Sequence, residues 1–327
     1  MTIFRSRSTP LQLSDIDKYL RSRRADIEAT LEQLLPSPPT CPPLIAEAMR
    51  YSLFAGGKRI RPILALAAAD TIGGTSQKQI DNLVKPAACA VEMIHTYSLI
   101  HDDLPAMDND TMRRGRPTAH VVYGEGIAIL AGDGLLTEAF HALAHWPEST
   151  DPIVMARKLR TTKRISMASG VAGMVGGQGI DLQASGQILP TDSMPIVKTV
   201  ALDRNGLQAM HERKTGALIR AAAVSGSIMV GASDSEIEAV DGYAAKLGLG
   251  FQIIDDILDI EGDPDVLGKS TGKDVASGKQ TYPSVLGLEE SRALASQAIK
   301  EAKALLSEAG LGGRLSAIAD WVITRTH

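Results

Sequence analysis

The amino-acid sequence predicts an all-α fold in a single domain, and three observations support this. Aromatic residues make up only 4% of the 327 residues, whereas alanine, leucine, isoleucine and methionine, which favour helices, are abundant. Apolar residues recur at helical spacing in long segments, and no convincing run alternates as a half-buried strand does. No repeat with a period of about 20 to 50 residues and no change in composition marks a domain boundary. We therefore expect residues 1–327 to form one helical domain.

The expected helices are bounded by caps, glycines and prolines. Ser14 caps the first helix, and the proline-rich segment 36–43 ends it. Gly56 and Gly57 break the second, and Pro105 ends a long glycine-free helix. The ranges expected to be helical are 13–35, 44–54, 61–73, 79–104, 127–145, 151–170, 193–223, 234–261 and 289–307.

The overall charge and the cysteines exclude several classes of function. A formal net charge of −4 provides no basic surface to neutralise a polynucleotide backbone, so we expect no nucleic-acid partner. Cys41 and Cys89 lack metal-ligand spacing and are expected to be reduced thiols. No segment approaches the ~20 consecutive apolar residues of a membrane span, and the first residues lack the apolar core of a signal peptide. The sequence thus predicts a cytoplasmic protein without a membrane span.

An acidic cluster, DDLPAMD, stands where Pro105 ends the long helix. Asp102, Asp103 and Asp108 would converge there, and three carboxylates repel one another unless a cation joins them. A solvated helix end is the simpler alternative for this motif alone.

A second acidic cluster, DDILD, lies within the apolar run GLGFQIIDDILDI. Asp255 and Asp259 are one turn apart on one helix face, and Asp256 lies beside them. Carboxylates in this number suit Mg²⁺, which binds one or two of them together with substrate phosphates. Two such clusters imply a diphosphate held between them.

Other ligand chemistries fit these motifs less well. The first cluster lacks the glycine and the closing glutamate of a calcium loop, and no set of histidines and cysteines has zinc spacing. GDPDVLGKS resembles a phosphate-binding P-loop, but five residues separate Gly262 from Gly268 and no strand precedes them. We therefore expect Mg²⁺ and no nucleotide.

Cationic and polar side chains lie where a bound anion needs them. The basic groups beside the acidic clusters are Lys58, Arg59, Arg61, Arg113 and Arg114. Further polar groups are Lys214, Thr215 and Gln252, together with Lys269 and Lys279 in the polar segment 262–279, which is a candidate lid. His95 lies two helical turns before Asp102 on the same face. Each basic run alone would be typical of a solvated surface, but arginine beside metal-type clusters favours phosphate binding.

Together these motifs resemble the trans-type short-chain prenyl diphosphate synthases. GGKRIRP, DDLPAMD, RRG, KTG, FQIIDDILD and GKSTGKD occur in the family's order, and EMIHTYSLIHDDLPAMDNDTMRRGRPTAH is similar to the bacterial farnesyl diphosphate synthases. The resemblance runs from about residue 44 to the end. It implies an isoprenoid-synthase-type helical bundle around a central cavity, Mg²⁺ as the cofactor, and a homodimer. Asn109 and Thr111 depart from the aspartates that many relatives carry, but the presumed ligands are present.

The resemblance also implies roles for individual residues. The metal ligands would be Asp102, Asp103, Asp108, Asp255, Asp256 and Asp259, and the catalytic residues Lys214, Thr215 and Gln252. The allylic diphosphate would be held by these three together with Arg113, Lys269 and Lys279. Isopentenyl diphosphate would be held by Lys58, Arg61, His95 and Arg114, with Gly57 as a further substrate-binding residue and help from Arg325. The ending ITRTH departs from the family's usual tail.

Product length is expected to depend on Tyr97, with Ser98 beside it. Tyr97 lies five residues before Asp102, about 7.5 Å along the helix axis, where a large ring would block a longer chain. In similar sequences an aromatic residue here accompanies farnesyl products, although a packed core tyrosine is the simpler interpretation. We therefore expect Mg²⁺-dependent head-to-tail condensation of isopentenyl diphosphate with dimethylallyl and geranyl diphosphate, giving farnesyl diphosphate. The alternative is a geranylgeranyl or geranyl diphosphate synthase.

Two other classes of protein compete with this interpretation. A class I terpene cyclase shares the first acidic motif and the helical fold, but it usually carries an Asn/Ser/Glu set in place of the second aspartate motif. A noncatalytic partner subunit is the alternative from outside the enzymes, and loss of an acidic motif would indicate it. Both motifs are intact, so we expect an active prenyltransferase.

Overall fold

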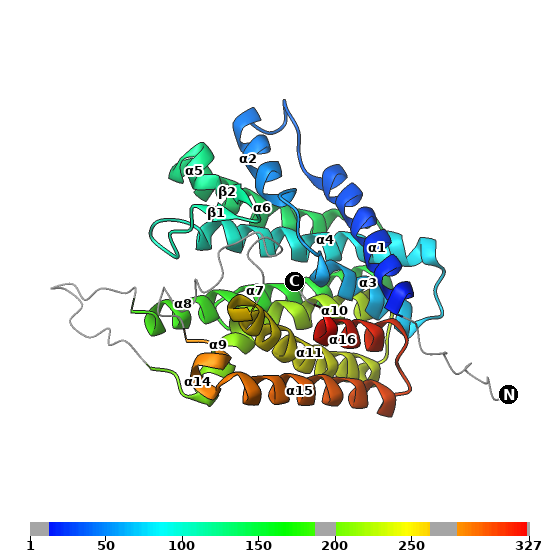
Figure 1. The fold of residues 1–327 in the computed structure, drawn as a ribbon. Helices are drawn as coiled ribbons and strands as arrows, with labels where there is room; N and C mark the ends of the chain where they lie inside the picture. Colours follow the sequence, from blue (N-terminus) through cyan, green and yellow to red (C-terminus); the bar gives the residue numbers. More distant parts are fainter. Residues whose placement is uncertain (1–12, 187–200, 262–279, 326–327) are drawn as a thin grey trace.

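The computed structural model describes residues 13–186, 201–261 and 280–325, most of which are helical (Figure 1). The first helices are α1 (Leu13–Leu34), α2 (Pro43–Leu53), α3 (Ile60–Ile72), α4 (Gln77–Asp102), α5 (Ala119–Tyr123), α6 (Glu125–His145) and α7 (Pro152–Ser169). The later ones are α8 (Met174–Ala184), α9 (Arg204–His211), the π-helix η1 (Glu212–Gly216), α10 (Ala217–Val230), α11 (Asp234–Glu261), α14 (Tyr282–Leu286), α15 (Leu288–Glu308) and α16 (Arg314–Thr324). The predicted all-α class is confirmed.

One short hairpin interrupts the helices between α4 and α5. Its strands are β1 (Met112–Arg113) and β2 (Arg116–Pro117), which pair antiparallel with Arg113 opposite Arg116. Strands of two residues are too short to produce a visible alternation of polar and apolar residues. The hairpin matters because it carries one of the predicted phosphate ligands, Arg113.

The long periodic helices match the predicted ranges closely, and the differences have local causes. The first helix is already formed at Leu13, so Ser14 lies within it and does not cap it. The predicted helix 193–223 is replaced, in its described part, by α9, η1 and α10, and α10 continues to Val230. The sequence did not predict α8, because three of its eleven residues are glycine, which disfavours helix by about 1 kcal/mol each.

The bundle is organised around α10, which contacts α3, α4, α7 and α11. Most residues of α10 are buried, and most of the buried ones are apolar, as expected for a central helix. α4 packs against α6 on one side, and α11 packs against α15 on another. Figure 1 shows α4 and α11 ending on the same side of the bundle. The two acidic clusters are therefore carried by helix ends on one side of the molecule.

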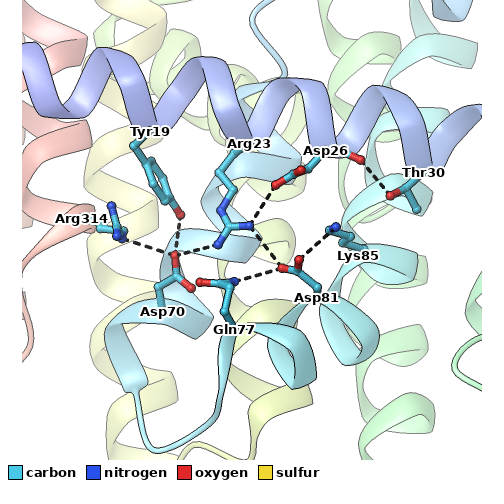
Figure 2. Close-up of polar contacts among 9 residues, drawn as sticks. All are labelled: Tyr19, Arg23, Asp26, Thr30, Asp70, Gln77, Asp81, Lys85 and Arg314. Carbon is cyan, nitrogen blue, oxygen red and sulfur yellow. Dashed lines mark hydrogen bonds and ion pairs between the residues drawn. The ribbon is translucent and has the colours of Figure 1, made fainter.

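A buried polar network fixes α1 to the rest of the bundle (Figure 2). Arg23 of α1 contacts Asp81 of α4 through Nη1 at 3.2 Å and Asp70 of α3 through Nη2 at 3.6 Å. The Tyr19 hydroxyl donates to the same Asp70 carboxylate at 2.8 Å, and Arg314 of α16 reaches it at 3.4 Å. These partners offset the desolvation of a buried guanidinium. None of the predicted site residues takes part, so the network serves the fold.

Among the described helices, α6 is the one that is long and apolar enough to span a membrane by composition. Its residues Ala128, Ala131 and Leu135 are buried. By contrast, the side chains of Ile129 and Leu130 are 41% and 52% exposed. α6 is thus a bundle helix with an uncovered apolar side.

Candidate active site

The first acidic cluster is formed by the end of α4 and the loop after it. Asp102 is the last residue of the helix, and the loop turns back so that the backbone N–H of Asp108 donates to the Asp102 carbonyl oxygen at 2.8 Å. Asn109 has a φ of 53°, a left-handed conformation that asparagine adopts more readily than most residues. Asparagine at position 109, where many relatives carry aspartate, therefore suits this backbone conformation. The turn holds Asp102 and Asp108 at one end of the helix.

Asp103 is buried and bound to Arg113 of the hairpin. The Nε of Arg113 donates to both Asp103 oxygens, at 2.8 and 2.9 Å, and Nη2 donates to Oδ1 at 2.7 Å. Burial opposes the charge of the guanidinium, but the hydrogen bonds and charge of Asp103 outweigh it and raise the pKa of Arg113. Asp103 therefore orients Arg113 beside the end of α4.

The charges of arginines from two distant segments act on His95 of α4. Burial lowers the pKa of His95 well below its ordinary value, and the charges of Arg61, Arg114, Arg113 and Arg59 lower it further. His95 is therefore neutral near pH 7 and can donate a hydrogen bond without adding charge. Three of the arginines predicted to hold a diphosphate, Arg61, Arg113 and Arg114, thus lie near enough to His95 for their charges to shift its pKa.

The glycine pair before α3 makes room for Arg114. Gly57 has a φ of +118°, and a Cβ built on it would lie 2.6 Å from Nη1 of Arg114. Arg114 donates to the carbonyl oxygen of Gly56, and burial among other arginines lowers its pKa to about 10. Lys58 lies over the ring of Trp321 in α16, with Nζ 5.9 Å from the ring centroid. These contacts join the GGKRIRP segment to the hairpin and to α16.

Arg59 differs from its neighbours because it points into the protein. Its Nη1 donates to Glu92 of α4 at 2.8 Å, and its Nη2 donates to the carbonyl oxygen of Leu53 at 2.5 Å. The side chain is fully buried. Arg59 therefore packs α3 against α4 and is not placed to bind an external anion directly.

In the second acidic cluster, Asp255 is partly exposed and meets Arg325. Nη2 of Arg325 donates to Asp255 Oδ1 at 2.7 Å and to the carbonyl oxygen of Phe251 at 3.1 Å, and the guanidinium stacks 3.9 Å from the Phe251 ring centroid. Burial lowers the pKa of Arg61, and the negative charge of Asp255 acts in the opposite direction and raises it. The second acidic cluster therefore borders the basic residues around His95.

The other two carboxylates of DDILD are buried. Asp256 is 4% exposed and Asp259 is 2% exposed. Asp256 accepts hydrogen bonds from Nε2 of Gln252 at 2.8 Å and from the backbone N–H of Tyr282 at 2.9 Å. Of the three predicted ligands, Asp255 is thus the one with a largely accessible side chain, 43% exposed.

Lys214 and Thr215 lie on the π-helix η1. A π-turn adds one residue to the helical turn and is frequent at functional sites. The hydroxyl of Thr215 donates to Oε1 of Gln252 at 3.0 Å, and the ammonium of Lys214 pairs with Asp181 of α8. The three residues predicted to be catalytic are therefore close together and held by hydrogen bonds.

The sequence pattern did not predict a role for Asp181. It lies in the glycine-rich segment GGQGIDL, where no helix was expected, so its spacing from other residues carried no signal. A carboxylate between isoleucine and leucine could have marked the segment as a site. α8 lies so close to η1 that a Cβ on Gly177 would be 2.3 Å from the backbone nitrogen of Lys214.

Tyr97 is wedged between α4 and α6. It is 8% exposed and meets the ring of His101 edge to face, with centroids 5.5 Å apart. Nε2 of His101 lies 3.0 Å from the carbonyl oxygen of Ile129 in α6, and the glycine at 132 leaves space for its ring. Tyr97 therefore has a fixed neighbour one turn above it. Ser98 donates to the carbonyl oxygen of His95.

The carboxylates fit Mg²⁺ in one particular way. Within residues 13–186, 201–261 and 280–325, no three His, Cys, Asp or Glu side chains could hold a metal ion by themselves. Mg²⁺ usually binds one or two carboxylates and completes its shell with water and substrate phosphates. Asp102, Asp108 and Asp255 suit such substrate-dependent binding. Lys269, Lys279 and the candidate lid lie outside the described residues.

Comparison with known proteins agrees with these motifs. The family model for polyprenyl synthetase matches residues 42–309. The chain is 43% identical over 320 residues to a geranylgeranyl diphosphate synthase from Cyanophora paradoxa, covering 97% of this chain and 99% of that one. It is 40% identical over 313 residues to a farnesyl diphosphate synthase from Bacillus subtilis, covering 95% and 99%.

Among solved structures, an FPP/GFPP synthase from Zymomonas mobilis is similar, with a TM-score of 0.78, 32% identity and coverage of 96% of this chain and 100% of that one. The gathered aspartates, the basic cluster at His95 and the match over most of the sequence agree. The chain belongs to the polyprenyl synthetase family and is a short-chain prenyl diphosphate synthase.

Proposed function

We propose that the enzyme condenses isopentenyl diphosphate with dimethylallyl diphosphate and then with geranyl diphosphate, in the presence of Mg²⁺, to give farnesyl diphosphate. The relatives named above make products of different length, so the proposal of a fifteen-carbon product rests on Tyr97.

The allylic diphosphate is assigned to the side that carries the aspartates, Arg113 and Lys214. Bound Mg²⁺ would be held by Asp102, Asp108 and Asp255 and would supply positive charge to the departing diphosphate oxygens. Arg113 is already oriented by Asp103, so it can grip phosphate oxygens with its remaining N–H groups. Preorganised charge of this kind is the main source of catalysis when charge develops on a leaving group.

Isopentenyl diphosphate is assigned to the basic residues around His95. In the described part of the chain, Nε of Arg61 and both Nε and Nη1 of Arg325 are buried without a hydrogen-bond partner. Buried cationic nitrogens without partners are costly, and a second diphosphate would satisfy them. The charge of Arg114 acts on His95, and Lys58 lies over Trp321, one helical turn before Arg325.

In the proposed reaction, the allylic carbon–oxygen bond breaks and leaves an allylic cation. The double bond of isopentenyl diphosphate attacks the cation and forms the new carbon–carbon bond, and a proton passes to the released diphosphate. The protein supplies no nucleophile. Thr215, Gln252 and the carbonyl oxygen of Lys214 offer dipoles that stabilise the cation.

Changing Tyr97 tests the proposed product length. The wild-type enzyme is expected to stop at fifteen carbons, because the ring of Tyr97 is fixed against His101 about 7.5 Å below Asp102. Tyr97→Ala is expected to release twenty-carbon and longer products, whereas the matched control Tyr97→Phe keeps the ring and the fifteen-carbon product. The measurement is mass analysis of the dephosphorylated products. A Tyr97→Ala variant that still stops at fifteen carbons would show that another residue forms the floor.

We also propose a cytoplasmic homodimer. Large apolar side chains are exposed on α6 and α7, which contact each other: Ile129, Leu130, Ile153, Met155, Leu159 and Met167. Exposed apolar side chains on adjoining helices are typical of a protein interface, and a second copy is the simplest partner to cover them. Cys41 and Cys89 are free and buried, which agrees with a reducing compartment.

Leu159→Glu tests the dimer. Leu159 is 72% exposed, so a charge there should leave the monomer folded while it opposes association. We expect light scattering to show a dimer for the wild type and a monomer for Leu159→Glu. Leu44→Glu, at a 47% exposed leucine on α2, is expected to remain dimeric. A monomeric wild type contradicts the proposal.

A further inference from the structure

Asp256 has a chemical environment unlike that of its neighbour Asp255. Its side chain is buried, and both carboxylate oxygens already accept hydrogen bonds, Oδ1 from Gln252 and Oδ2 from the backbone of Tyr282. We propose that Asp256 is a positioning residue, not a metal ligand, and that it fixes the direction of the hydrogen bond between Gln252 and Thr215. This inference rests on the proposed reaction and deepens it.

The carboxylate of Asp256 determines which way the Gln252 amide points. A glutamine amide has one accepting end and one donating end, which look alike in shape. An ionised carboxylate only accepts hydrogen bonds, so it must face the NH₂ group of Gln252, 2.8 Å away. The amide oxygen is therefore turned toward Thr215.

The amide in turn determines which way the Thr215 hydroxyl points. Oε1 of Gln252 has no proton to give, so the hydroxyl of Thr215 must donate to it across 3.0 Å. Thr215 is partly exposed, and the lone pairs of its hydroxyl are then directed away from Gln252. A hydroxyl oriented in this way presents the negative end of its dipole to an allylic cation, whereas the reverse orientation would present a proton.

The position of Asp256 is itself secured by a second helix. The backbone N–H that binds its Oδ2 belongs to Tyr282, the first residue of α14, whose ring is fully buried. That ring stacks on His211, the last residue of α9 before η1, with centroids 5.5 Å apart. The contacts thus form a closed path from η1 through α11 and α14 back to α9. This path holds in place the two successive hydrogen bonds from Asp256 through Gln252 to Thr215, which we call the relay.

Asp256→Asn should reverse the relay without removing any side chain. The new amide can still accept from the Tyr282 N–H, but it now donates toward Gln252. The Gln252 amide then turns its oxygen toward residue 256 and its NH₂ toward Thr215, whose hydroxyl must accept. The proton of the Thr215 hydroxyl then points away from Gln252, toward the cation.

The expected consequence is a change in how the cation is captured. Isopentenyl diphosphate and water compete for the allylic cation. When the Thr215 hydroxyl turns its proton toward the cation, the cation is held less well for attack by isopentenyl diphosphate, and more of it reacts with water to give the allylic alcohol. Asp256→Asn is expected to raise the ratio of alcohol to condensed product by roughly tenfold, a modest change beside the roughly 100- to 1,000-fold effect of losing an oxyanion-hole donor. Destabilisation alone would lower the amount of active enzyme but leave this ratio unchanged.

A double-mutant cycle with Thr215→Val tests the relay. Valine has the shape of threonine and no hydroxyl, so Asp256→Asn should have little further effect on the product ratio in the Thr215→Val background. If the effects of Asp256→Asn and Thr215→Val on the product ratio simply multiply in the double variant, the inference is wrong. Thermal unfolding of each variant confirms that the compared proteins are folded.

Binding of Mn²⁺ in the presence of inorganic diphosphate tests the role of Asp256 without turnover. Asp256→Asn is expected to bind Mn²⁺ with an affinity close to that of the wild type, whereas Asp255→Asn is expected to bind it more weakly. If Asp256→Asn loses Mn²⁺ as strongly as Asp255→Asn, Asp256 is a ligand and the inference is wrong. If Asp255→Asn also keeps its affinity, the proposed metal site fails, while the product ratio still decides the relay.

Discussion

Asp102→Ala and Asp255→Asn are each expected to lower the rate of condensation by at least about 1,000-fold. Each removes an anionic ligand from a different acidic cluster, and metal charge on the leaving diphosphate contributes several kcal/mol to the transition state. Asparagine is chosen at position 255 because it can still accept the hydrogen bond from Arg325, whose buried guanidinium would otherwise be left with the carbonyl oxygen of Phe251 as its acceptor. The measurement is the steady-state rate of condensation at saturating Mg²⁺.

A surface aspartate provides the control for these two variants. Asp234 is 88% exposed at the start of α11 and pairs with Arg160, away from both acidic motifs in the sequence. Asp234→Asn is expected to retain the wild-type rate. If Asp102→Ala or Asp255→Asn remains nearly as active as this control, the metal assignment is wrong.

Gly177→Ala is expected to lower kcat by about 100-fold, the size of effect that a misplacement of about 1 Å can have on catalytic groups. The added methyl group would lie 2.3 Å from the backbone nitrogen of Lys214, closer than any carbon can approach, so either α8 or η1 must move. Movement of η1 displaces both Lys214 and Thr215. Single-turnover kinetics measures the chemical step directly.

Gly179→Ala is the matched control, since it lies on the same helix two residues later. A Cβ at Gly179 would meet no atom of the described residues within 4 Å. This variant is expected to keep the wild-type rate and to gain up to about 1 kcal/mol in stability, because alanine favours helix over glycine. Equal rates for Gly177→Ala and Gly179→Ala would show that the fit of α8 against η1 is not needed for catalysis.

The sequence predicted which residues gather but not how they divide their roles. Helical spacing placed Asp255 beside Gln252. The family resemblance assigned Arg61, Arg114 and His95 to one anion site, and in the structure the charges of both arginines act on His95. Spacing does not reveal partners on other helices. The pairing of Asp103 with Arg113 depends on the hairpin between them, and the pairing of Asp181 with Lys214 depends on the docking of α8.

The same distinction holds for the fold. Long helices such as α4 and α11 were predictable because many apolar residues repeat at one spacing. The π-turn η1 has no such signal, since one extra residue in a single turn changes no pattern on either side. α8 was hidden by its glycines, although Gly177 is what allows α8 to reach Lys214. The least predictable helix thus carries a close contact of the candidate site.

The proposed condensation is tested by incubating the purified protein with isopentenyl diphosphate, dimethylallyl diphosphate and Mg²⁺, with and without a chelator. The dephosphorylated products are then analysed by mass. We expect a fifteen-carbon alcohol that requires the metal and disappears with the chelator. A metal-dependent product of another length would keep the reaction and refute the role of Tyr97. The absence of any condensed product would contradict the proposed function.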